Sequence, residues 1–176
     1  MNAMLKRAAA AGACASAAAV VVAFLVCLPA FAQPSSLVGS AAPRVSIEGA
    51  HREIVAIPSP GKVTVVLFWN SRYRLSVEAL AALGRIWDAC KGRGLVCAGL
   101  SDVGEDASVV RQAGQQAGVS FPLAGGTAAS DAAVLYRVRG VPVLFVINRS
   151  GQITYVREGW DGGAESDVSS RVMASL

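Results

Sequence analysis

Three continuous runs of apolar residues stand out along the chain, over Val63–Trp69, 95–100 and 141–148. Runs of this length that are rich in β-branched and aromatic residues predict strands that are buried on both faces of a sheet. Two shorter segments, 45–47 and 53–57, predict short strands at an edge of that sheet. The pattern therefore indicates a protein with a covered central sheet.

Between the apolar runs, hydrophobic residues follow the 3.6-residue period of a helix. In the segment 76–91, Leu80, Leu83, Trp87 and Cys90 recur on one helical face, and glycines follow the segment. The pattern also predicts helices over 105–117, 131–137 and 168–175, and a strand over 152–157 that pairs back after a turn at 149–151.

Strands that alternate with helices and end in a hairpin predict an α/β fold with a mixed central β-sheet flanked by helices. Pro142 lies at the beginning of an apolar strand. Because proline donates no ladder hydrogen bond, we expect it at the first residue of the strand or on an edge. A cis bond between Val141 and Pro142 is one way to place it there.

The first 32 residues have the pattern of a signal peptide. Lys6 and Arg7 precede a long uncharged segment, which ends in Ala30-Phe31-Ala32. We expect cleavage after Ala32, which divides the chain into a signal peptide (1–32), a short polar leader (33–36) and one domain (37–176). The alternative is an uncleaved membrane anchor, because the apolar segment is long enough to span a bilayer. In both cases the domain lies outside the cytoplasm, and a periplasmic location is expected.

Composition narrows the classes of function. With 53% hydrophobic and 16% charged residues, the chain is not intrinsically disordered. The net charge of +4 includes Lys6 and Arg7, and it falls to +2 after cleavage. The remaining basic residues are scattered, so nucleic acid is not an expected partner. His51 is the only histidine, and we expect neither a metal site nor a cofactor.

Five short motifs follow one another between about residues 37 and 160. They are Gly39-x-x-Ala42-Pro43, Gly61-Lys62 before the run that ends in Phe68-Trp69, Phe121-Pro122, Tyr136-x-Val138-x-Gly140-x-Pro142, and the hairpin from Phe145 to Ile153. In this order they resemble the thioredoxin superfamily, especially its exported TlpA/ResA/CcmG-like branch (redoxin, AhpC/TSA-type). The resemblance implies a thioredoxin-like fold and a thiol-disulfide oxidoreductase ancestry.

The sequence departs from this family where the family carries its chemistry. The Phe-Trp strand of the family leads into C-x-x-C, whose first thiolate attacks a disulfide and whose second cysteine resolves the mixed disulfide. Here the corresponding residues are Tyr73-Arg74-Leu75-Ser76. Tyr73 stands at the attacking position and Ser76 at the resolving one, and neither side chain exchanges disulfides. No residue is therefore predicted to be catalytic at this turn.

Cys90 and Cys97 are the two cysteines that remain after signal cleavage. They admit three interpretations: two buried thiols, a structural disulfide or a relocated redox pair. An oxidising compartment favours a disulfide. Geometry opposes it, because a helix packs about 10 Å from a sheet while bridged Cα atoms lie about 4.4–6.8 Å apart.

Two functions follow from the resemblance. The first is a non-catalytic module that binds an envelope protein or an extended peptide at Trp69, Tyr73, Val141 and Pro142. The resemblance implies that the backbone before the proline pairs with a strand of the partner. The alternative is a thiol-disulfide oxidoreductase of the TlpA/ResA type, acting in cell redox homeostasis through Cys90 and Cys97.

Overall fold

A five-stranded sheet forms the centre of the protein, in the order β5-β4-β3-β6-β7. The structure is a computed structural model, and it describes residues 33–176. The strands are β3 (Val63–Trp69), β4 (Leu95–Ser101), β5 (Leu123–Ala124), β6 (Val143–Ile147) and β7 (Ile153–Glu158). β3 runs parallel to β4 and antiparallel to β6, so the sheet is mixed as predicted.

The central strand β3 separates two hydrophobic cores. All seven of its residues are buried, and successive side chains of a strand point to opposite faces. Val65, Leu67 and Trp69 belong to the core on one face, whereas Val66 and Phe68 belong to the core on the other. The uninterrupted apolar run is explained by this covering on both sides.

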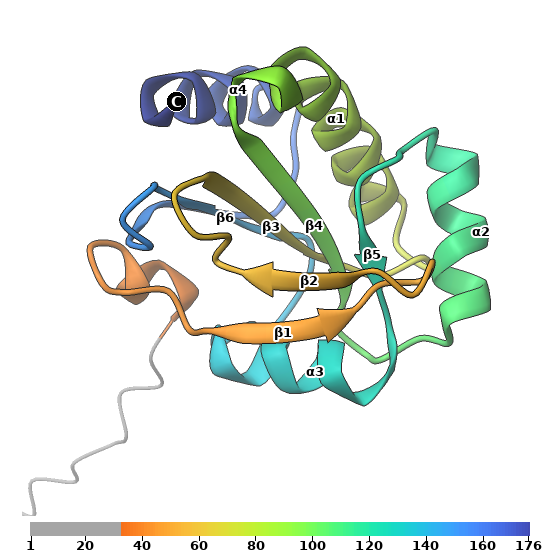
Figure 1. The fold of residues 1–176 in the computed structure, drawn as a ribbon. Helices are drawn as coiled ribbons and strands as arrows, with labels where there is room; N and C mark the ends of the chain where they lie inside the picture. The colour runs from red at the N-terminus through yellow and green to blue at the C-terminus, as the bar shows by residue number, and fades with distance from the viewer. Residues whose placement is uncertain (1–32) are drawn as a thin grey trace, which may run out of the picture. The chain divides into compact units, whose positions relative to one another are not determined.

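Helices cover both faces of the sheet (Figure 1). The first core includes residues of α1 (Arg74–Cys90), α2 (Ala107–Ala117) and α4 (Ala164–Ser175). The second includes residues of α3 (Gly126–Leu135). Leu80, Leu83 and Cys90 of the predicted apolar helical face are fully buried in α1. The predicted α/β class is therefore confirmed.

The first two strands do not extend the central sheet. β1 (Val45–Glu48) and β2 (Ile54–Ile57) pair only with each other in the described part of the chain, in an antiparallel two-stranded sheet. The expectation of strands at the edge of the main sheet was wrong. The tip of this hairpin still touches the main sheet, because the Ala50 amide donates to the Leu123 carbonyl over 2.6 Å.

The first element of the described chain is a short 3-10 helix. Pro34–Leu37 form a 3-10 helix, η1, in which Pro34 and Leu37 are buried. The Gly39 amide then donates to the Ile153 carbonyl over 2.8 Å, which joins this segment to β7. A second 3-10 helix, η2 (Lys91–Arg93), connects α1 to β4. The polar segment 33–36 is thus part of the fold.

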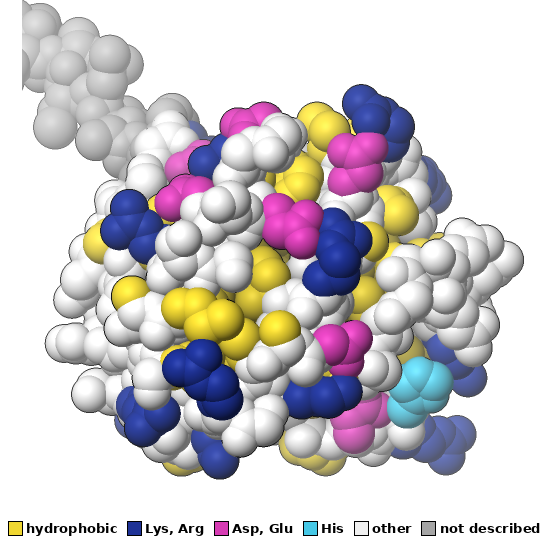
Figure 2. Space-filling model, turned by 90° about the horizontal axis from the view of Figure 1, so that it is seen from above, with side chains coloured by type: hydrophobic (Ala, Val, Ile, Leu, Met, Phe, Trp, Pro, Cys, Tyr) yellow, Lys and Arg dark blue, Asp and Glu magenta, His cyan; other side chains and the backbone are white. Residues whose placement is uncertain are grey.

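The predicted signal peptide lies outside the described residues. Within residues 33–176, no helix is both long enough and apolar enough to cross a bilayer. On the face that α1 and α4 form, basic and acidic side chains are intermixed (Figure 2). Several form ion pairs, such as Arg85 with Glu165 at 2.6 Å.

Candidate functional site: the turn between β3 and α1

The turn from Asn70 to Tyr73 connects the central strand to the first helix. Tyr73 is the N-cap residue of α1, with an extended backbone (φ −105°, ψ 119°). Its side chain is 58% exposed, whereas Ser76 is fully buried one turn into the helix. The two residues at the C-x-x-C positions therefore differ: a phenol faces solvent, and a hydroxyl faces the core without a hydrogen-bond partner among the described residues.

Glu105 holds this turn against the end of β4. Its carboxylate accepts hydrogen bonds from the Ser71 hydroxyl (2.5 Å) and the Ser71 amide (3.2 Å). It also accepts one from the Ser101 hydroxyl (3.1 Å). Because hydrogen bonds to an ionised group are stronger than neutral ones, Glu105 fixes the position of the turn.

A second contact joins the same two segments. The Asn70 side-chain amide donates to the Asp102 carboxylate over 3.2 Å, and the Asn70 side-chain oxygen accepts from the Arg72 amide over 3.0 Å. Sequence reasoning missed this network. A signal was available, because polar residues directly follow two neighbouring parallel strands, whose carboxyl ends meet at one edge.

Burial raises the pKa of the Asp102 carboxyl above its ordinary 3.8, although the Asn70 amide lowers it in part. The folded state thus favours the protonated acid, whose stabilising contribution is present below pH 3.8 and is lost as the pH rises through the raised pKa. We expect Asp102→Asn to be more stable than wild type at pH 7, by a margin that disappears as the pH falls toward 4. Thermal melts of both proteins at a series of pH values measure this margin. A margin that is the same at pH 4 and pH 7 contradicts the assignment.

Trp69 does not lie on the surface of the turn. Its side chain is fully buried in the core beneath α1, and its indole Nε1 has no acceptor among the described residues. We expected Trp69 to contact a bound peptide, but its buried side chain does not reach the surface in this structure. The alternation of side chains along β3 directs residue 69 into the core.

Val141 and Pro142 lie across from the end of β3. Phe68 pairs with Val143, which places the preceding Pro142 beside the beginning of the turn. The peptide bond between Val141 and Pro142 is cis. The Pro142 carbonyl accepts from the Gly159 amide over 2.8 Å, whereas no backbone hydrogen bond engages Val141 in the described chain.

The two arginines on either side of Tyr73, Arg72 and Arg74, differ in whether they form an ion pair. Arg74 forms an ion pair with Glu78, one helical turn farther along α1. No ion pair engages Arg72 within residues 33–176. Of the two arginines that flank Tyr73 in the sequence, only Arg72 is thus without an ion pair among these residues.

Cys90 and Cys97 are both free thiols and fully buried. Cys90 is the last residue of α1, and Cys97 lies in β4. Burial raises the pKa of the Cys97 thiol, and the nearby Cys90 raises it further. The sequence left three interpretations open, and the structure agrees with the one in which both cysteines are buried free thiols.

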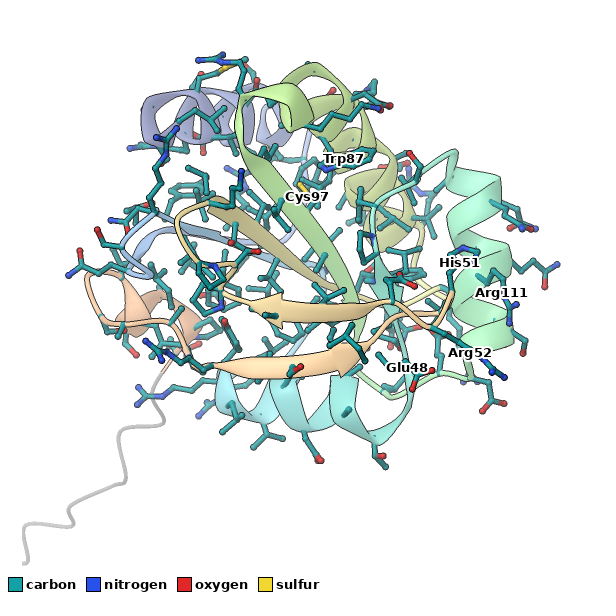
Figure 3. All side chains as sticks on the ribbon, viewed as in Figure 1. Glu48, His51, Arg52, Trp87, Cys97 and Arg111 are labelled. Atoms are coloured by element: carbon teal, nitrogen blue, oxygen red, sulfur yellow. The ribbon has the colours of Figure 1, made fainter. Side chains whose placement is uncertain are left out.

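His51 is exposed at the tip of the β1–β2 hairpin. Figure 3 shows it with Glu48 and Arg52, beside Arg111 of α2. These four residues contribute to the lining of one shallow hollow. Within residues 33–176, no three His, Cys, Asp or Glu side chains come together in a group that could hold a metal ion.

No family model matches the chain, and no curated protein is similar enough in sequence to count as a relative. Solved structures do share its fold. A thiol:disulfide interchange protein of the thioredoxin family from Chlorobium tepidum TLS is 21% identical, with a TM-score of 0.67 over 77% of this chain and 94% of that one. The thioredoxin domain of a thiol-disulfide oxidoreductase from Bacteroides vulgatus is 18% identical, with a TM-score of 0.66 over 77% of this chain and 97% of that one.

StoA from Bacillus subtilis is also similar, at 18% identity with a TM-score of 0.62 over 73% of this chain and 96% of that protein. Each of these structures is matched over nearly its whole length. The thioredoxin-like fold is thereby confirmed, and it is shared with the thiol:disulfide interchange protein and the thiol-disulfide oxidoreductase domain named above.

Proposed function

We propose that this thioredoxin-like protein is an exported, non-catalytic module that binds an extended segment of another envelope protein at the turn between β3 and α1. One observation carries the proposal. Tyr73 presents an exposed aromatic ring at the position of the attacking cysteine, and the sequence contains no C-x-x-C. The surface that would receive a substrate is thus retained without the thiol that would react with it.

Two further features of the turn suit a peptide. The backbone groups of Val141 have no backbone partner in the described chain, and unpaired backbone groups bind an added strand through main-chain hydrogen bonds. Arg72 supplies a positive charge that no ion pair neutralises there. We therefore expect a partner segment that is extended and carries an acidic residue near an apolar one.

The alternative function, disulfide exchange by Cys90 and Cys97, has less support. Both thiols are fully buried, so a substrate disulfide cannot reach them in this conformation. Activated cysteines lie at a helix N-terminus or beside a cation, whereas Cys90 is the last residue of α1 and Cys97 lies in β4.

Photo-cross-linking in the envelope tests the docking surface. With the photoreactive residue p-benzoyl-phenylalanine at position 73, we expect covalent adducts with a small number of partners. The matched control carries the same residue at position 134, where Val134 is exposed on α3. Equal adducts at both positions would show general collisions and contradict a specific surface.

The affinity of an identified partner then measures the contribution of the ring. Tyr73→Ala is expected to weaken binding by roughly 30-fold, because a buried aromatic anchor of an interface contributes about 2 kcal/mol. Val134→Ala serves as the control and should leave the dissociation constant unchanged. A Tyr73→Ala protein that binds as tightly as wild type would remove Tyr73 from the site.

A further inference from the structure

A hollow of about 300 Å³ lies between the tip of the β1–β2 hairpin, α2 and the segment 119–123, and we call it the hairpin pocket. Its apolar lining includes Phe121, Pro122 and Leu123. The Phe121 ring packs edge-on against the Trp87 ring, with 6.1 Å between their centroids. None of the lining residues belongs to the turn between β3 and α1. The hairpin pocket is therefore a separate feature, with the volume and apolar lining of a small-ligand site.

The tip of the hairpin fixes a carboxylate in this pocket. The Glu53 side chain lines the pocket, and its Oε2 accepts a hydrogen bond from the His51 amide over 3.0 Å. A Cβ atom on Gly49 would lie only 2.1 Å from the Glu53 Oε1, so the carboxylate occupies space that a glycine leaves free. The Gly49 amide donates to the Glu53 carbonyl over 2.8 Å, which closes the tip. The negative charge is thus positioned by the backbone of the hairpin.

Arg111 of α2 brings a positive charge to the same pocket. Figure 3 shows it beside His51 of the hairpin tip. The helix approaches closely because Gly114 has no side chain: an added Cβ would lie 2.4 Å from the Leu123 Cδ1. Within residues 33–176, neither Arg111 nor Glu53 forms an ion pair. The pocket thus presents two opposite charges next to an apolar surface, and no ion pair of the described chain neutralises them.

We propose that the hairpin pocket binds a free α-amino acid with an apolar side chain. The Arg111 guanidinium suits the carboxylate of this ligand, because its N–H groups form two parallel hydrogen bonds to such a group. The Glu53 carboxylate receives the ammonium group, and the apolar side chain of the ligand lies against Phe121 and Pro122. Burial of that side chain supplies affinity. The two charges orient the ligand and select against molecules that carry only one of them.

Titration of the isotope-labelled exported protein with L-phenylalanine, followed by NMR, tests the site. We expect saturable changes in the amide resonances of residues 50–53, 111–115 and 119–123, and none at the turn from 70 to 73. Phenylpropionate lacks the ammonium group and phenethylamine lacks the carboxylate, so each leaves one charged group of the pocket unmatched. Each should bind at least about 10-fold more weakly than phenylalanine, the usual loss for one hydrogen bond to a charged group.

Two variants assign the charges of the pocket. Arg111→Gln and Glu53→Gln should each weaken the binding of phenylalanine by about 10-fold, and neither replaces a buried side chain. Arg44→Gln and Glu158→Gln are the matched controls and should bind like wild type. Both residues are exposed, lie outside the pocket and form no ion pair within residues 33–176.

Three results would overturn the proposal. They are the absence of a saturable change below the solubility limit of phenylalanine, equal binding of phenylpropionate or phenethylamine, and unchanged affinity in either pocket variant. None of these results depends on the peptide-binding proposal, because no residue of the turn between β3 and α1 is altered.

Discussion

Replacing Tyr73 and Ser76 together with cysteine is expected to give the protein disulfide reductase activity through these two positions. The fold already places position 73 at the N-terminus of α1, where the helix dipole and free amides lower the pKa of a thiol. Position 76 lies one turn farther along the same helix, where a resolving cysteine is needed. Reduction of insulin by dithiothreitol measures the gain, which we expect to be at least about 100-fold over the wild-type rate, or 2.7 kcal/mol in the barrier.

Two control proteins are needed to interpret the result of this experiment. Wild type and a Cys90→Ala, Cys97→Ala variant should both match the rate of dithiothreitol alone. A wild-type rate that is clearly higher, and that is lost in the Cys90→Ala, Cys97→Ala variant, would restore the oxidoreductase alternative. An inactive but folded Tyr73→Cys, Ser76→Cys protein would mean that the turn has diverged in more than its two reactive residues.

Trp69→Ala is expected to destabilise the domain by about 3–5 kcal/mol, the usual cost of removing a large buried aromatic side chain. The side chain is completely inaccessible and lies among residues of β3, β4 and α1. Domains of this size are stable by about 5–15 kcal/mol, so this loss removes a large share of the total. Chemical denaturation followed by circular dichroism measures the difference in the free energy of unfolding.

Trp69→Phe and Trp160→Ala separate the causes of this loss. The indole Nε1 of Trp69 has no acceptor in the described chain, so Trp69→Phe loses volume without losing a hydrogen bond and should be milder than Trp69→Ala. Trp160 is only partly buried, and its replacement by alanine should also cost less. If Trp69→Ala were as stable as wild type and failed only to bind a partner, Trp69 would belong to the docking surface after all.

The fold was largely predictable because it depends on signals that are local in sequence. The apolar run Val63–Trp69 coincides with β3, residue for residue. The predicted helix over 76–91 is observed as Arg74–Cys90, two residues earlier at its beginning. The two-residue strand β5 was missed, because so short a strand has no periodicity to detect and exists only through its pairing with β4.

The candidate site was predicted less completely than the fold. Tyr73 is exposed at the turn and Val141 lies near the end of β3, in the region that the motifs indicated. Trp69 was predicted to bind a peptide but is buried, and Glu105 was predicted only as the first residue of a helix. Glu105 is 34 residues from Ser71 along the chain, so only the parallel pairing of β3 with β4 brings the two together.

The sequence by itself determined which reactive side chains are available and which elements form. The absence of C-x-x-C is a matter of residue identity, and the order of strands and helices follows from hydrophobic periodicity. The tertiary structure decided which side chains reach solvent. Trp69 and Cys97 are buried while Tyr73 is exposed, and no local pattern separates these outcomes. Burial depends on what packs against each face of the sheet, and α1, β4 and α4 come from distant parts of the chain. The same long-range packing places Met173 beside Cys90.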